Sequence, residues 1–299
     1  MGGYSDEHYA ASLSHWGSPR YLTGCDGWLL VRPIADFHAH DAMGSYPLFA
    51  CRDWSQLARD LDGQRDLVAV SMVTDPFGVY DESLLATCFP DLLSPYKEHF
   101  VVDLRQDPDQ FISARHQRNL QRSRKQVQVE RCEAPEVFLE DWIGLYEQLI
   151  LRHQIQGIAR FSRRAFAEQF QTPGLVAFRA TVNRQTVGML LWYVSGDVAY
   201  YHLGAYSELG YQTRASFGLF KAAIDYFSKQ VRWLSLGAGA GSVGNAGDGL
   251  NQFKRGWSTG TRLTYFCGRI FDHEAYDFLV NRSGAPATSF FPRYRLGDF

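Results

Sequence analysis

Lys254 is the residue whose type and neighbours point most directly to chemistry. It lies in the run LNQFKRGWS, 250–258, which we predict to be a short helix with Phe253 and Trp257 turned inward. Lys254 would then lie beside a glycine-rich run and a sheet edge. An ammonium group there can bind an anionic donor or stabilise an oxyanion, and a plain surface charge is the alternative. Two further polar residues of this helix that could contact a donor are Asn251 and Arg255.

The glycine-rich run, 237–244, follows a predicted strand. It contains a G-x-G-x-x-G match at Gly239, Gly241 and Gly244. A dinucleotide fold needs this turn in an early strand-turn-helix unit followed by an acidic residue, and a phosphate-binding P-loop needs G-K-[ST]. Since neither condition is met, we interpret the run as a loop over a cleft, with Gly239 and Gly241 as substrate contacts.

His202 is the candidate base for an acceptor amine, because imidazole exchanges a proton near neutral pH. Alternation along its predicted strand places it on the same face as Tyr200 and Gly204. A core histidine bonded to a backbone carbonyl is the alternative. Tyr201 and Tyr211 are candidate acids or acceptor contacts.

Asp75 follows a continuous apolar strand, Leu67 to Val73, which Pro76 and Gly78 must end. A carboxylate at the end of a strand suits a substrate contact, and an Asx turn that closes the loop is the alternative. The sequence does not rank the fallback bases, which are Asp75, Glu208 and Asp225.

A polar stretch, 35–45, contains His38, His40 and Asp41. The H-x-H-D spelling invites a metal site, but a third ligand at a defined spacing is missing. We therefore expect a solvent-facing loop and no metal.

The segment SARHQRNLQRSRKQ, 113–126, is the most basic part of the chain. Helical spacing places Arg115, Arg118, Arg122 and Lys125 on one face. Such a stripe can bind a phosphorylated donor or an RNA backbone through bidentate contacts. A solvated helix that connects two halves of the protein is the alternative.

The elements that position these residues change period along the chain. Residues 186–194 and 197–206 predict a β-hairpin with its turn at Ser195-Gly196. Residues 213–230 predict an amphipathic helix, which leads to a strand at 231–236. A helix between two strands allows them to lie parallel, so we expect ligands beyond their C-terminal ends, around residues 204–214 and 237–257.

The composition describes a folded protein with no strong preference for polyanions. The 299 residues carry a net charge of −2, and 45% of them are hydrophobic. Five cysteines are widely scattered, and neither a signal peptide nor a membrane span is visible, so we expect a cytoplasmic protein.

Two motifs and the order of elements carry a family resemblance. The chain resembles the GNAT acyltransferase superfamily, and within it the tandem-domain FemAB-like branch. The resemblance is carried by the motif HQRNL at 116–120, the motif FKRGW at 253–257 and the order of elements over 140–271. The resemblance implies an α/β (α+β) fold of two tandem GNAT-like domains, each a mixed twisted sheet flanked by helices. We expect these domains at 1–112 and 132–285, with a basic connecting segment at 113–131 and a tail at 286–299 that packs on the body or on a second copy.

The resemblance further implies transfer of an acyl or aminoacyl group to a primary amine, with Lys254 at the junction of donor and acceptor. GNAT enzymes that use acyl-CoA present a [QR]-x-x-G-x-[GA] loop to the pyrophosphate, and only Gly210 is available in the corresponding stretch, 208–215. Arg214 and the helix N-terminus could still receive a phosphate. The expected donor contacts of this loop are Gly210, Tyr211, Gln212 and Arg214.

Three functions stay open on these grounds. The first is an acyltransferase that uses acyl-CoA as donor and holds no permanent cofactor, acting on a small-molecule or peptide amine. The second takes aminoacyl-tRNA as donor, contacted through Arg115, Arg118 and Arg122. The third is a non-catalytic binding or scaffold protein; a monomer and a homodimer are both compatible with the sequence.

Overall fold

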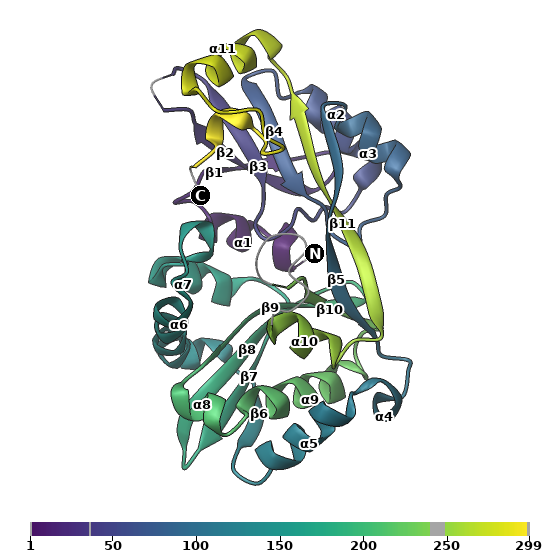
Figure 1. Cartoon of the computed structure of the whole chain (residues 1–299), viewed down its shortest axis with the longest axis vertical. Helices are drawn as coiled ribbons and strands as arrows, with labels where there is room; N and C mark the ends of the chain where they lie inside the picture. Colours follow the sequence, from purple (N-terminus) through teal and green to yellow (C-terminus); the bar gives the residue numbers. More distant parts are fainter. Residues whose placement is uncertain (1, 36, 240–248, 298–299) are drawn as a thin grey trace. The chain divides into compact units, whose positions relative to one another are not determined.

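The chain forms two units in the computed structural model, which describes residues 2–35, 37–239 and 249–297 (Figure 1). The central unit consists of Lys97–Arg262 with Met1–Gly3, and the terminal unit of Tyr4–Tyr96 with Leu263–Phe299. This division differs from the predicted linear ranges 1–112 and 132–285. The chain passes from one unit to the other within a strand at two places, between Tyr96 and Lys97 and between Arg262 and Leu263. The segment that begins at Leu263 belongs to the same unit as the N-terminal residues. The periodicity of the sequence does not reveal this arrangement.

The sheet of the central unit has the strand order β5-β10-β9-β8-β7-β6. Neighbouring strands are antiparallel, except that β9 and β10 are parallel. The strands are β5 (Leu92–Asp103), β6 (Gln128–Cys132), β7 (Leu175–Val182), β8 (Gln185–Ser195), β9 (Val198–Tyr206) and β10 (Trp233–Gly237). Its helices are α4 (Pro108–Phe111), α5 (Ala114–Ser123), α6 (Leu139–His153), α7 (Arg163–Gln171), α8 (Glu208–Gln212), α9 (Ala215–Phe227) and α10 (Gly249–Arg255), with short 3-10 turns at Pro135–Phe138 and Gly157–Ala159.

The predicted hairpin, helix and parallel strand are confirmed as β8, β9, α9 and β10. Ser195 pairs with Val198 across the tight turn, where Gly196 has φ +57°. Along α9 the buried side chains recur at three- and four-residue steps and pack on the sheet. The buried residues of α9 are Ala215, Leu219, Phe220, Ala223, Ile224 and Phe227.

The parallel strands β9 and β10 pair over only three positions, Trp233 to Ser235, among the described residues. Beyond Ser235, β10 stays with its other neighbour, since Gly237 pairs with Phe100 of β5. β9 pairs with β8 from Val198 to Tyr206, and its part from Tyr201 onward has only this partner strand among the described residues. The two parallel strands therefore separate toward their C-terminal ends, the position at which we expect a ligand.

Helices cover both faces of this sheet. On one face α9 packs on the strands, and α5 packs on α9; on the other, α6 and α7 pack on β8, β9 and β7. Neighbouring residues of β9 show the alternation: the Tyr201 ring contacts Phe220 of α9, whereas the His202 ring contacts Phe161, just before α7.

The sheet of the terminal unit has the order β1-β2-β3-β4-β11, with β3 and β4 parallel and the other pairs antiparallel. Two buried clusters fill it, one of them beneath α11. The strands are β1 (Ser18–Leu22), β2 (Gly27–Pro33), β3 (His40–Gly44), β4 (Leu67–Val73) and β11 (Gly260–Ile270). The helices are α1 (Glu7–Ser12), α2 (Leu57–Asp62), α3 (Glu82–Cys88) and α11 (His273–Ser283), with 3-10 turns at Gly3–Ser5, Trp54–Gln56 and Arg293–Arg295.

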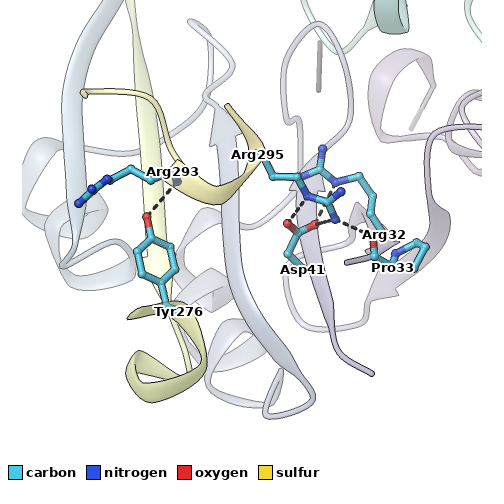
Figure 2. Close-up of polar contacts among 6 residues, drawn as sticks. All are labelled: Arg32, Pro33, Asp41, Tyr276, Arg293 and Arg295. Carbon is cyan, nitrogen blue, oxygen red and sulfur yellow. Dashed lines mark hydrogen bonds and ion pairs between the residues drawn. The ribbon is translucent and has the colours of Figure 1, made fainter. Parts of the chain in front are cut away.

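The predicted solvent-facing loop at 35–45 is wrong for its second half, which is the strand β3. Asp41 is fully buried and pairs across the strands with Arg32 of β2, with 3.0 Å between Nε and Oδ1. Arg295 of the tail also donates to Asp41, from Nε at 2.8 Å and from Nη2 at 3.1 Å, and to the Pro33 carbonyl oxygen at 2.7 Å (Figure 2). The sequence does not reveal this buried position, because the carboxylate of Asp41 is satisfied by Arg32 on the neighbouring strand and by Arg295 near the other end of the chain.

The C-terminal tail packs on the terminal unit. Phe291 and Tyr294 contact the cluster around α11, and the backbone N–H of Arg293 donates to the Tyr276 hydroxyl at 3.1 Å (Figure 2). Each unit is thus a mixed sheet flanked by helices, and the predicted fold class is confirmed.

Candidate functional site

Lys254 lies on α10 with only 6% of its surface exposed. Its ammonium donates to the Ala238 carbonyl oxygen, just past the end of β10, at 2.5 Å. Nζ is also 5.7 Å from the centre of the Tyr201 ring on β9. A β-carbon at Gly237 would come within 3.2 Å of Nζ, so the glycine gives the ammonium room. The positive charge therefore lies in the opening between β9 and β10.

His116 joins the two motifs that carry the family resemblance. Its Nε2 donates to the Phe253 carbonyl oxygen at 2.8 Å, which leaves Nδ1 to accept from Ser113 Oγ at 2.9 Å in the neutral ring. Burial lowers the pKa of His116 and favours this neutral form. A β-carbon at Gly256 would overlap the imidazole ring. The histidine of HQRNL and the glycine of FKRGW thus hold α5 and α10 together, which fixes the position of Lys254.

A cavity of about 270 Å³ lies between α5 and the start of α9. Its walls are Arg115, Arg118, Asn119, Arg122 and Arg214. Within the described part of the chain, none of the four arginines forms an ion pair and no side chain hydrogen-bonds the Asn119 amide, which is 7% exposed. We call this cavity the arginine recess. Guanidinium groups without carboxylate partners suit a bound oxyanion.

The sequence predicts four basic residues on one face of α5, and three of them lie together in the structure. Arg115, Arg118 and Arg122 line one cavity, as their helical spacing predicts. Lys125 lies beyond the end of α5 at Ser123 and does not line it. The sequence did not predict Asn119 as a wall residue, because nothing in the pattern of residue types sets one amide between arginines apart before the cavity is known.

The loop before α9 does not form the backbone cradle that was expected around Gly210. Gly210 is buried, its N–H donates to Ser207 Oγ at 3.2 Å, and a β-carbon there would overlap the Val187 carbonyl. The glycine is needed for close approach to β8 and does not offer its N–H to a phosphate.

Only one of the four predicted loop contacts lines the arginine recess. The Tyr211 ring lies 4.1 Å from the Arg152 guanidinium, and Gln212 Nε2 donates to Glu208 Oε1 at 3.4 Å. Arg214 is the residue at the recess; it precedes α9 in the left-handed conformation, with φ +59°.

The structure does not bring His202 and Lys254 together. His202 faces the α7 side of the sheet, where its Nε2 lies 3.1 Å from Gln169 Oε1. Burial lowers its pKa to about 3, so it stays neutral. The alternative of a packed core histidine describes this residue, and the partner of its Nε2 is the side-chain amide of Gln169.

Tyr201 lies on the same side of β9 as Lys254. Burial raises the pKa of Tyr201 and of Tyr206, so both phenols keep their protons at neutral pH. A β-carbon at Gly204 would overlap the Tyr201 hydroxyl, which explains the glycine between them. The opening therefore holds one ammonium and two phenol groups.

His99 of β5 is a residue that the sequence reading missed. Its neighbour Phe100 pairs with Gly237, so His99 lies next to the strand end at which Lys254 is bonded. Burial, and then the charges of Lys254 and Lys97, lower its pKa to about 3. Its buried Nδ1 has no hydrogen-bond partner among the described residues. The run YKEHFVVDL gave no sign of this, because one histidine in an apolar strand is typical of a core residue.

The remaining predicted contacts have different surroundings. Asp75 belongs to the terminal unit, where it accepts from the Phe77 N–H at 2.9 Å in the Asx turn foreseen as its alternative. A β-carbon at Gly239 would overlap the Asn251 amide, so these two pack together. Arg255 is exposed on α10, and Gly241 lies outside the described residues.

Neither a metal centre nor a membrane span is found in the described ranges. Across residues 2–35, 37–239 and 249–297, no three histidine, cysteine or acidic side chains gather closely enough to hold a metal ion. No helix in these ranges combines the length and the apolar composition needed to cross a membrane.

Comparison with known proteins gives a domain assignment and a fold. Residues 113–255 match the family model described as an acetyltransferase (GNAT) domain. The search of curated proteins gave no significant match. Among solved structures, FemX shares 13% identity with a TM-score of 0.64, over 91% of this chain and 93% of that one.

Two further solved structures have the same fold. The C-terminal domain of a putative lysylphosphatidylglycerol synthetase from Agrobacterium fabrum shares 12% identity with a TM-score of 0.62, over 90% of this chain and 88% of that one. L-PGS from Bacillus licheniformis shares 14% identity with a TM-score of 0.60, over 94% of this chain and 98% of that one. Residues 113–255 therefore match a GNAT domain, and the chain shares its fold with FemX and with the two structures above.

Proposed function

We propose that this chain is an N-acyltransferase that moves an acyl group from an acyl-CoA-type donor to a primary amine of a small molecule or peptide. The GNAT domain and the Fem-like fold support acyl or aminoacyl transfer in general. The observation that carries the proposal is the buried ammonium of Lys254 in the opening between the separating strands β9 and β10. A fixed positive charge in a buried opening can stabilise the oxyanion that forms in acyl transfer.

In the proposed reaction a neutral amine attacks the thioester carbonyl carbon. The N–C bond forms, and the carbonyl oxygen becomes an oxyanion that the Lys254 ammonium stabilises. The C–S bond then breaks, the amine loses one proton, and the leaving thiolate takes up a proton to become a thiol. Tyr201 and Tyr206, which keep their protons, can donate hydrogen bonds to the oxyanion or the thiolate.

The group that accepts the proton of the amine differs from the one that the sequence suggested. His202 lies on the opposite face of β9 from Tyr201, so we no longer propose it as the base. The buried positive charge of Lys254 itself favours the neutral form of an approaching amine. In this proposal the proton leaves through solvent or through the product thiolate.

Aminoacyl-tRNA is the second candidate donor. The observation that favours it is the row of exposed arginines on α5 together with a loop whose Gly210 N–H is already bonded. That arrangement replaces backbone contacts to a pyrophosphate by side-chain contacts, which an RNA backbone also accepts. A non-catalytic ligand-binding protein is the remaining alternative.

A screen of donors tests the proposal. The purified chain is incubated with acetyl-CoA, longer acyl-CoAs or aminoacyl-tRNA together with a panel of primary amines, and amide products are detected by mass spectrometry. We expect an amide from acyl-CoA. An amide from aminoacyl-tRNA alone would replace our choice of donor by the second candidate, and the absence of any amide with intact donor binding would favour the non-catalytic alternative.

A further inference from the structure

A second cavity lies in the terminal unit, where the tail packs against the end of β2. Its volume is about 430 Å³, which is sufficient for a small organic ligand. The wall combines two arginines, two serines and the rings of a histidine and a tryptophan: Arg32, Arg295, Ser14, Ser18, His15 and Trp16. We call this cavity the tail recess, because Arg295 reaches it from the C-terminal tail.

The tail recess is separate from the proposed site of acyl transfer. All of its wall residues belong to the terminal unit, whereas Lys254 belongs to the central unit. Within the terminal unit, Pro33 of the wall pairs with His40, and His40 pairs with Leu67, the first residue of β4. Asp75 follows the other end of that strand. The recess therefore lies at the opposite end of the sheet from Asp75 and has no role in the reaction proposed above.

Two arginines of the tail recess share one carboxylate. The Asp41 side chain has 0% exposed surface, and the side chains of Arg32 and Arg295 are 6% and 12% exposed. Both guanidinium groups meet at the Asp41 carboxylate (Figure 2). Because arginines are permanently charged, this group of three carries one positive charge in excess. A charge that is removed from water is costly without a counter-ion.

The hydrogen-bond donors of the two arginines also outnumber the acceptors of Asp41. Two guanidinium groups carry about ten N–H donors, and one carboxylate offers about four lone-pair sites. Asp41 accepts from Arg32 Nε and from Arg295 Nε and Nη2, and Arg295 Nη2 also donates to the Pro33 carbonyl oxygen. One carboxylate cannot occupy every donor of both arginines, so a second carboxylate fits the same pair.

The rest of the wall indicates what the second carboxylate is attached to. The rings of His15 and Trp16 meet edge to face with their centres 5.7 Å apart, and Val31 and Pro33 add apolar surface. A flat apolar body can pack on such a wall.

The charge of the wall indicates a ligand with one negative charge. Partial burial lowers the pKa of His15, so its ring is neutral at pH 7 and the excess stays at one positive charge. No acidic side chain lines the recess among residues 2–35, 37–239 and 249–297. A carboxylate matches this excess, whereas a phosphomonoester carries about 1.5–2 negative charges.

We infer that the tail recess binds a small organic monocarboxylate with a flat apolar body. Its carboxylate lies against Arg32 and Arg295, and its body lies against Trp16. Since Arg295 belongs to the tail, a bound ligand also stabilises the packing of the tail on the terminal unit. The inference is independent of the proposed function, so Lys254→Met should bind the same carboxylates as the wild type does.

Ligand-observed NMR titrations of the full chain test the inference with benzoate, phenylacetate and indole-3-acetate. The matched controls are benzamide, phenylacetamide and indole-3-acetamide, which have the same shapes without the charge. We expect saturable binding of at least one carboxylate and none of its amide. Absence of saturable binding for all three carboxylates at millimolar concentration, or equal binding of each acid and its amide, would overturn the inference. Tighter binding of phenyl phosphate than of any carboxylate would overturn the assignment of a single negative charge.

Two variants locate the bound carboxylate. Arg295→Gln leaves Arg32 and Asp41 as a balanced pair, so binding should weaken about 10- to 100-fold through loss of a charge-assisted bond. Ser14→Glu places a carboxylate in the wall at an exposed position, so it should abolish binding while the fold is kept. The Tm of each variant, measured by circular dichroism, shows that it is folded.

Arg282→Gln is the matched control, because Arg282 is an exposed arginine in the last turn of α11 and is outside the wall. Carboxylate binding should be unchanged in this variant. Wild-type affinity in folded Ser14→Glu would overturn the inference. Weakening in Arg282→Gln equal to that in Arg295→Gln would also overturn it, because binding would then follow the net charge of the unit and not the tail recess.

Discussion

Replacing Lys254 by methionine should abolish most activity and leave the fold intact. Methionine is nearly as long as lysine and fills the same space, so no cavity forms. The variant loses the hydrogen bond from Nζ to the Ala238 carbonyl oxygen, and a bond to a charged group contributes about 1.5–3 kcal/mol. Part of this loss is offset, because Lys254 is only 6% exposed and the cost of desolvating its ammonium disappears.

These terms give a net change of less than about 2 kcal/mol in the free energy of unfolding, or a shift in Tm of a few degrees. The effect on catalysis should be larger, since removal of one oxyanion-stabilising group costs about 100- to 1,000-fold in kcat. Rates of amide formation, measured by mass spectrometry at saturating donor and amine, give the comparison.

Lys229→Met is the control, because Lys229 is an exposed lysine just after α9. It should keep the wild-type rate. If Lys254→Met kept its rate within twofold while remaining folded, the ammonium would have no part in the reaction, and the assignment of the opening between β9 and β10 as the site of transfer would be refuted.

Three further outcomes are expected. Gly256→Ala should lower the free energy of unfolding, measured in urea, by about 1–3 kcal/mol, because a β-carbon at Gly256 overlaps the His116 ring. Gly249→Ala is the control: nothing lies within 4 Å of the added atom, so the change should be less than about 0.5 kcal/mol. Equal effects of the two substitutions would contradict the packing of Gly256 on His116. His99 has a pKa of about 3 in the folded protein and about 6.5 in the unfolded chain, so between these pH values only the unfolded state binds the proton, and the free energy of unfolding falls as the pH drops below 6.5. His99→Gln should therefore reduce the decrease in the free energy of unfolding between pH 7 and pH 5 by about 2 kcal/mol. An unchanged pH dependence of stability would show that the imidazole is not held neutral. Arg118→Glu combined with Arg122→Glu should weaken donor binding at least 100-fold, measured by calorimetry at constant ionic strength, and unchanged binding would place the donor elsewhere.

The sequence was sufficient where local periodicity determines structure. The hairpin β8–β9 and the helix α9 follow from alternation and from three- and four-residue spacing, and the tight turn at Gly196 follows from its glycine. The stripe of arginines on α5 was also visible, because residues three and four apart must share a helix face.

The sequence was insufficient where a residue's role depends on distant partners. Asp41 was expected in a solvent-facing loop, but it is buried because Arg32 and Arg295 satisfy its carboxylate. His202 and Tyr201 are adjacent in sequence, and only the packing of α9 and α7 decides which of them faces Lys254. The sequence motif placed Gly210 in a phosphate-binding loop. In the structure, Gly210 is a glycine because a β-carbon there would overlap the Val187 carbonyl oxygen.

The rate of amide formation from acetyl-CoA and a panel of primary amines, compared between the wild type and Lys254→Met, tests the central proposal most directly. We predict that the wild type forms an amide with release of one free thiol per amide, and that Lys254→Met forms it about 100- to 1,000-fold more slowly while its Tm shifts by no more than a few degrees. Equal rates in the two proteins, or no amide from acetyl-CoA or any longer acyl-CoA, would contradict it.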